Sequence, residues 1–94
     1  MAVALAHFKV QDYDKWLVAF RAGAAMRAAG GCKGVHIFYN SDDKTDIIIN
    51  FNFEDRAKAE AMLAEPGTRE AQAGAGVIGR PELTWVEDGG REPS

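Results

Sequence analysis

The chain has 94 residues, of which 47% are hydrophobic and 10% aromatic, and its formal net charge is −3. These values exclude a disordered chain and predict one domain near the lower size limit for independent folding. The acidic balance, the scattered basic residues and the lack of an apolar run of about 20 residues argue against nucleic-acid and membrane partners.

The first predicted element is a strand from Ala2 to Val10. Its alternating faces carry Val3, Leu5 and His7 on one side, and Ala4, Ala6, Phe8 and Val10 on the other. Both faces are largely apolar, so we expect this strand at the centre of a sheet. We expect the face that carries His7 to lie against a layer of helices, at the edge of a cleft.

A long helix follows the first strand. Asp12 is a suitable N-cap, and the helix is predicted to run to about Ala29, where Gly30 and Gly31 end it. Its apolar stripe consists of Tyr13, Trp16, Leu17, Phe20 and Ala24, with Lys15, Arg21 and Arg27 beside it. The chain's one cysteine, Cys32, lies in the connection that follows. It permits no internal disulfide and suits a reducing cytosol, so we predict a cytoplasmic protein.

The segment Thr45–Phe53 has the strongest strand pattern in the chain. Large apolar residues occupy its odd positions, Ile47, Ile49, Phe51 and Phe53, whereas Asp46, Ile48, Asn50 and Asn52 occupy the even ones. The odd face is therefore predicted to contact the helices. A preceding strand, Val35–Asn40, and the polar turn at residues 41–44 predict a hairpin.

The remaining elements are shorter. A second helix is predicted to start at Glu54-Asp55, to use Ala59, Met62 and Leu63 as apolar contacts, and to end at Pro66-Gly67. Thr68 is predicted to cap a short helix over Arg69–Ala75, and Gly79-Arg80-Pro81 is predicted to lead into a last strand, Glu82–Glu87. Residues 1–87 are thus predicted to form a single domain, and residues 88–94 a flexible tail.

The predicted order, β-α-β-β-α-β, is that of the ferredoxin-like α+β fold, a four-stranded antiparallel sheet with helices on one face. So short a chain can cover only one face of such a sheet. A homodimer that buries the second face is the simplest remedy.

With that order in place, several segments resemble the dimeric α+β-barrel superfamily. They are the strand running into residues 10–16 (VQDYDKW), the pair Gly30-Gly31, the acidic turn at 41–43, the strand closed by Glu54-Asp55, and the Gly-x-Pro at 79–81. The resemblance covers roughly residues 3–87. The superfamily includes antibiotic-biosynthesis monooxygenases and small polyketide cyclases.

This resemblance implies a homodimer in which each subunit binds an apolar small molecule in a cleft between sheet and helices. It also implies activity without a metal or organic cofactor, as in several members. The haem-degrading branch is discounted, because its iron-binding histidine on the second helix has no counterpart between Asp55 and Gly76.

Two polar residues are candidates for catalysis. A neutral His7 imidazole on an apolar face could take a proton from a phenol or an activated carbon acid, and Tyr39 is a second polar candidate near the pocket. The alternative for His7 is a buried histidine bonded to backbone or to a carboxylate. A metal site built from His7, His36 and Cys32 is not expected, because no spacing suggests that they converge.

The predicted substrate-binding wall consists of Trp16, Phe20, Phe51, Met62 and Trp85, although such an aromatic set also suits an ordinary core. Asn50 and Asn52 are assigned to the dimer interface. Their alternative role is to polarise a substrate carbonyl or to stabilise an enolate.

Two functions remain open at this point. The first is cofactor-independent oxygenation or cyclisation of a hydrophobic aromatic or polyketide-like substrate. The second is a non-catalytic ligand-binding or stress-responsive dimeric barrel. A cavity of a few hundred cubic ångströms beside His7 favours the enzyme, and a solidly packed helix–sheet layer favours the second function.

Overall fold

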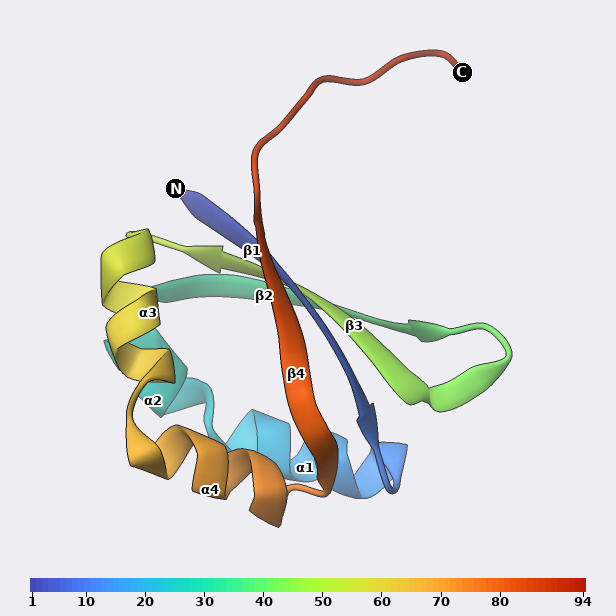
Figure 1. The fold of residues 1–94 in the computed structure, drawn as a ribbon, viewed down its shortest axis with the longest axis vertical. Coiled ribbons are helices and arrows are strands. Elements are labelled where there is room, and N and C mark those ends of the chain that lie inside the picture. The colour runs from blue at the N-terminus through green and yellow to red at the C-terminus, as the bar shows by residue number, and fades with distance from the viewer.

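The computed structural model describes residues 1–94. The elements follow in the order β1 (Ala2–Val10), α1 (Tyr13–Ala22), α2 (Ala24–Ala29), β2 (Cys32–Asn40), β3 (Asp43–Phe53), α3 (Arg56–Leu63), α4 (Pro66–Gly74) and β4 (Val77–Val86). The strands form one antiparallel sheet in the order β2-β3-β1-β4, and the helices pack against one of its faces (Figure 1). The predicted ferredoxin-like fold and the central position of the first strand are confirmed.

The core lies between the sheet and the helices. Ile47, Ile49 and Phe53 of β3 are at most 1% exposed, which confirms that the odd positions of this strand contact the helices. Trp16 of α1 packs on Ile47 and Ile49, while Ala59 of α3 packs on Phe53. These contacts place α1 and α3 over different parts of the same sheet face.

The other face of the sheet carries no helix, and we call it the open face. Its side chains include Val3, Leu5, His7 and Lys9 of β1; His36 and Phe38 of β2; Asp46, Ile48, Asn50 and Asn52 of β3; and Thr84 and Val86 of β4.

The expected orientation of β1 is wrong. Ala4, Ala6 and Val10 are the buried residues of this strand, so the alternation turns His7 to the open face. The small alanine side chains let the helices and the Trp16 ring approach the sheet closely. Both faces of β1 are apolar in sequence, and the pattern alone therefore did not decide between them.

The predicted helix from residue 12 to about residue 29 is in fact two helices. Asp12 caps α1 as predicted, with its Oδ1 accepting from the Lys15 amide at 2.9 Å. Gly23 then ends α1 and precedes α2, and Gly30 ends α2. The alanine-rich sequence around Gly23 has high helix propensity, which hid this break.

Three further elements begin earlier in the chain than predicted: α4, β2 and β3. Helix α4 begins at Pro66, which suits the first turn of a helix because proline lacks an amide hydrogen. Thr68 is not the cap, since its hydroxyl donates to the Met62 carbonyl at 2.8 Å. Strands β2 and β3 begin at Cys32 and Asp43, two to three residues before the predicted starts.

Strand β4 starts at Val77 rather than at Glu82 and contains an irregularity. His7 pairs with Glu82 and Lys9 pairs with Ile78, so residues 79–81 oppose Phe8 alone. Gly79 has φ +72°, a value that suits glycine. The Gly-Arg-Pro segment, which is predicted to lead into the strand, is a bulge inside the strand.

The residues after Val86 form neither helix nor strand, and Figure 1 shows them extending away from the sheet. The flexibility of residues 88–94 and the domain boundary at residue 87 stay predictions. None of the helices has the length and hydropathy needed to cross a membrane.

Candidate ligand-binding pocket

A cavity of about 320 Å³ lies between the sheet and the helices. Such a volume is within the range of small-molecule sites in proteins. Fifteen of its 22 lining residues are hydrophobic, and they come from β1, β3, β4 and all four helices. The helix–sheet layer is therefore hollow. The cavity lies on the opposite side of the sheet from His7, whereas the observation expected to favour the enzyme was a cavity beside His7.

Aromatic rings form one wall of the cavity. The ring centroids of Trp16 and Phe20 are 4.9 Å apart, and Trp16 also lies 5.7 Å from Phe8. Phe20 in turn lies 6.3 Å from Phe51 of β3. These spacings are typical of favourable aromatic contacts, so the rings hold one another in position. The wall suits a flat apolar ligand.

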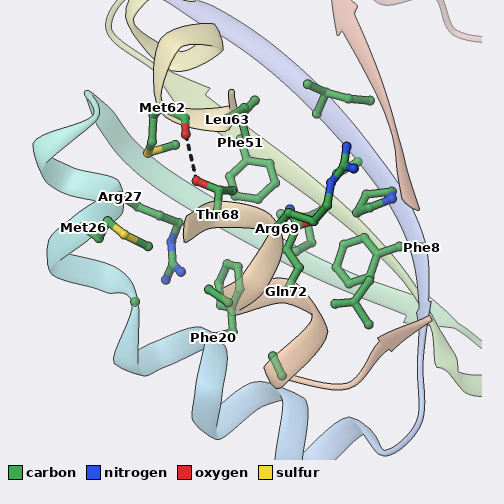
Figure 2. A pocket seen from close by; sticks show the side chains of 18 of the residues that line it. Phe8, Phe20, Met26, Arg27, Phe51, Met62, Leu63, Thr68, Arg69 and Gln72 are labelled. Carbon is green, nitrogen blue, oxygen red and sulfur yellow. Dashed lines mark hydrogen bonds between the residues drawn. The ribbon is translucent and has the colours of Figure 1, made fainter. Parts of the chain in front are cut away.

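The polar lining is basic and contains no carboxylate. Its polar and charged members are Arg27, Thr68, Arg69, Gln72 and Arg80. Figure 2 shows Arg27 on the α2 side of the cavity, and Arg69 and Gln72 together on α4. The bulge of β4 turns Arg80 to the same cavity.

None of the three arginines has an ion-pair partner. The ion pairs of the structure involve His7, Lys9, Lys33, Lys44 and Arg56 instead. The Arg27 guanidinium lies over the Phe20 ring, with its Cζ 3.7 Å from the ring centroid. Burial lowers the pKa of Arg27 from its usual value, and a smaller Coulombic effect of Cys32 opposes this change. The arginine stays protonated at neutral pH.

The cavity includes most of the predicted wall. Trp16, Phe20, Phe51 and Met62 line it, and their binding of a substrate stays a prediction. Trp85 lies outside: its ring packs 5.7 Å from Phe53, with the Arg56 guanidinium 5.0 Å from its centroid. It pairs with Ala4, near the end of the sheet that α3 covers, and is thus part of the core there.

The structure does not bring His7 and Tyr39 together. On the open face, His7 Nε2 lies 2.7 Å from Asp46 Oδ1. Tyr39 lies on the helix-facing side, opposite Ile47, with its ring 5.2 Å from that of Tyr13. Neither residue lines the cavity. Their catalytic roles stay predictions, and no contact with the cavity supports them.

The two asparagines of β3 lie on the open face. Asn50 is flanked by Leu5 of β1 and His36 of β2, and Asn52 lies two residues further along the strand. The Asn50 Oδ1 atom is buried and has no hydrogen-bond partner within the chain. An acceptor in that state gains from a donor supplied by another molecule. Their role in a dimer interface stays a prediction.

The pocket residues that the sequence does not predict include all of its polar lining: Arg27, Thr68, Arg69, Gln72 and Arg80. The sequence predicts Arg27 at the margin of a helical stripe and Arg80 in a connection between elements. The helix break at Gly23 and the bulge at Gly79 turn them to the cavity, and neither has a periodic signature. No group of three or more His, Cys, Asp or Glu side chains is placed to bind a metal ion.

No family model and no curated protein matches this chain. Solved structures do match it. The cofactor-independent oxygenase SnoaB from Streptomyces nogalater is similar with a TM-score of 0.75 at 16% identity, covering 99% of this chain and 97% of SnoaB.

Two structures described as antibiotic biosynthesis monooxygenases are also similar. One, from Bordetella bronchiseptica, has a TM-score of 0.77 at 12% identity, covering 93% of this chain and 95% of its own. The other, from Nitrosomonas europaea, has a TM-score of 0.68 at 16% identity, with coverages of 94% and 98%. At such identities the similarity is one of fold. The chain has the α+β fold of the antibiotic-biosynthesis-monooxygenase-like proteins.

Proposed function

We propose that the protein binds a hydrophobic aromatic or polyketide-like small molecule in the helix–sheet cavity and promotes its cofactor-independent oxygenation or cyclisation. The observation that carries the proposal is the cavity itself, about 320 Å³ in volume and lined mainly by hydrophobic residues. Its aromatic wall would hold a planar substrate, and the similar fold of SnoaB supports the reaction class.

In the oxygenation, the substrate itself supplies the electrons. Loss of a proton from an activated C–H or phenolic O–H group gives an electron-rich anion, which reacts with dioxygen. The protein would lower the barrier by orienting the substrate and stabilising the negative charge as it develops. The guanidinium groups that face the cavity suit this second task.

The alternative is a binding protein without catalysis, and one observation favours it. None of the 22 lining residues is His, Cys, Tyr, Asp or Glu, so no lining side chain is an ordinary proton acceptor near neutral pH. Under the oxygenase proposal, proton loss to solvent must then suffice, helped by the nearby cations.

We also propose that two copies of the chain pair through their open faces. This face carries the half-exposed apolar side chains of Leu5, Phe38 and Ile48. It also carries Asn50, whose buried oxygen lacks a partner. A cytoplasmic location remains part of the proposal.

Anthrone is a suitable test substrate, because it is planar and has an acidic CH2 group between two rings. Anthrone and one O2 give anthraquinone and one water. We expect the protein to accelerate both oxygen uptake and the rise of anthraquinone absorbance, with or without a chelator. Binding without acceleration would support the non-catalytic alternative and contradict the oxygenase.

A matched pair of variants on α4 controls for the site. Ala71 lines the cavity and Ala73 does not. Both side chains are exposed, so either position accepts a larger residue without disturbing the core. Ala71→Trp should reduce the acceleration and Ala73→Trp should not. Equal rates in the two variants would contradict catalysis in this cavity.

A further inference from the structure

We infer that the cavity selects ligands that carry a negatively charged oxygen, and that Arg27 is the main partner of that oxygen. The inference rests on the proposed function, since it assumes that the cavity binds an aromatic molecule. It adds the charge of that molecule and the residue that recognises it.

The distribution of charge is the first argument. The chain has 14 acidic and 11 basic residues, so carboxylates outnumber cations. Yet Arg27, Arg69 and Arg80 all face one cavity without a single carboxylate in its lining. The acids Asp14, Asp43, Asp46, Glu54 and Glu60 make their ion pairs elsewhere. An anion from solution would supply the missing counter-charge.

The state of Arg27 is the second argument. Arg27 is partly buried, whereas Arg69 and Arg80 are exposed, and burial lowers the pKa of Arg27. A cation that has lost part of its water without gaining a carboxylate is electrostatically under-compensated. The Phe20 ring, 3.7 Å away, compensates only in part, because a ring face attracts a cation more weakly than a carboxylate does.

The local backbone provides the room for this guanidinium. A Cβ atom at Gly23 would lie 3.0 Å from Arg27 Nη1, closer than most such contacts. Gly23 thus ends α1 and at the same time leaves space for the Arg27 head group at the cavity wall. In this position the guanidinium lies over the Phe20 ring of the aromatic wall.

The cavity therefore matches a ligand with two parts. An aromatic body would lie on Phe20 and its neighbours, and an acidic oxygen would accept from Arg27. Arg69 and Arg80, which are exposed, would attract the anion at the rim. A carboxylate or an ionised phenol would meet this description equally, so the test must include both.

The test uses Trp85→Phe protein, which leaves Trp16 as the only tryptophan and places it in the cavity wall. Quenching of Trp16 by energy transfer would report the binding of anthracene-9-carboxylate and of its neutral analogue 9-anthracenemethanol. We expect the carboxylate to bind about tenfold more tightly, the effect of one charge-assisted hydrogen bond. For phenols, we expect bound 2-naphthol to ionise at a lower pH than free 2-naphthol, as seen in its absorbance.

Arg27→Gln is the informative variant, and Arg21→Gln is its control. Arg21 is exposed in the last turn of α1 and does not line the cavity. Arg27→Gln should weaken carboxylate binding about tenfold and leave the neutral alcohol unchanged, because only the charged contact is lost. Arg21→Gln should change neither affinity.

The outcomes separate this inference from the proposed function. If both anthracenes bind equally and 2-naphthol keeps its solution behaviour, the cavity binds aromatics but does not select anions, and the inference fails alone. Equal weakening of both ligands by Arg27→Gln would also refute it. If neither anthracene binds, the ligand-binding cavity and the inference are both wrong.

Discussion

The carboxylate of Asp46, on β3, bonds to side chains of both neighbouring strands, β1 and β2. Its Oδ1 lies 2.7 Å from His7 Nε2, and Asn40 donates to its Oδ2 at 3.2 Å. The hydrogen bond with His7 is the main cause of a lowered pKa for Asp46, and the bond from Asn40 adds to it. His7 is thus bonded to a carboxylate, as in the structural alternative that the sequence left open. It differs from that alternative in being exposed on the sheet surface rather than buried.

This pairing predicts a dependence of stability on acid. A carboxyl group whose pKa is lower in the folded state stabilises the fold above its unfolded value, about 3.8, and loses this effect as pH falls through the folded value. We expect Asp46→Asn to be less stable than the parent at pH 7, with the difference shrinking below about pH 4. Urea midpoints measured across this range check it.

Asp42→Asn is the control, because the Asp42 side chain makes no hydrogen bond or ion pair. Its stability should follow the parent curve at every pH. A difference in stability between the parent and Asp46→Asn that stays constant throughout the acid range would contradict the role assigned to the hydrogen bond between Asp46 and His7.

At the scale of elements, the contact between the end of α2 and helix α3 shapes the cavity. Gly30 ends α2 at φ −82°, a conformation that any residue adopts. A Cβ there would clash with Met62 Sδ and would lie 3.2 Å from Met62 Cβ. Met62 lines the cavity, so the absence of a side chain at residue 30 lets α3 place this methionine in the wall.

Gly30→Ala tests this packing. Alanine would reduce the entropy of the unfolded chain, but the contact with Met62 is too short to keep, so we expect a net loss of about 1–3 kcal/mol. Combining it with Met62→Ala removes the contacts with Sδ and Cγ and leaves only the one with Cβ, so the double variant should be more stable than the sum of the single effects predicts. Chemical denaturation gives the free energies of unfolding of the parent, the two single variants and the double variant. Strict additivity, or a stabilised Gly30→Ala, would show that the helices tolerate the added methyl group.

At the scale of the whole molecule, the sheet is covered on one face only. Leu5, Phe38 and Ile48 are between 38% and 47% exposed at the centre of the open face. None of the helices or strands of residues 1–94 lies over them. Adjacent exposed apolar residues of this kind mark an interaction surface.

We therefore expect a dimer in sedimentation velocity at micromolar concentration. Ile48→Glu should shift the protein to a monomer, since a dimer through this face would bury the new charge without a partner. Val18→Glu is the control, because Val18 is 68% exposed on α1, away from the sheet. A parent protein that sediments as a monomer, or a dimer that persists in Ile48→Glu, would rule out pairing through the open face.

Several features followed from the sequence alone. The alternation in residues 45–53 identified the buried face of β3, Asp12 and Asp55 marked helix starts, and the order of elements predicted the fold. Each is a local property, since a period or a cap depends on neighbours along the chain. Four residues of the cavity lining were also predictable from the sequence: Trp16, Phe20, Phe51 and Met62. Large apolar side chains face the interior whether or not the interior contains a cavity.

The tertiary structure alone decided which face of β1 meets the helices and which charges meet in the cavity. Both faces of β1 are apolar, so the burial of Ala4 and Ala6 rather than Val3 and Leu5 depends on how closely the helices approach. Arg27, Arg69 and Arg80 come from three separate elements, α2, α4 and β4, and all three line the cavity. Convergence of this kind depends on packing between distant segments, which no short-range pattern of residues records.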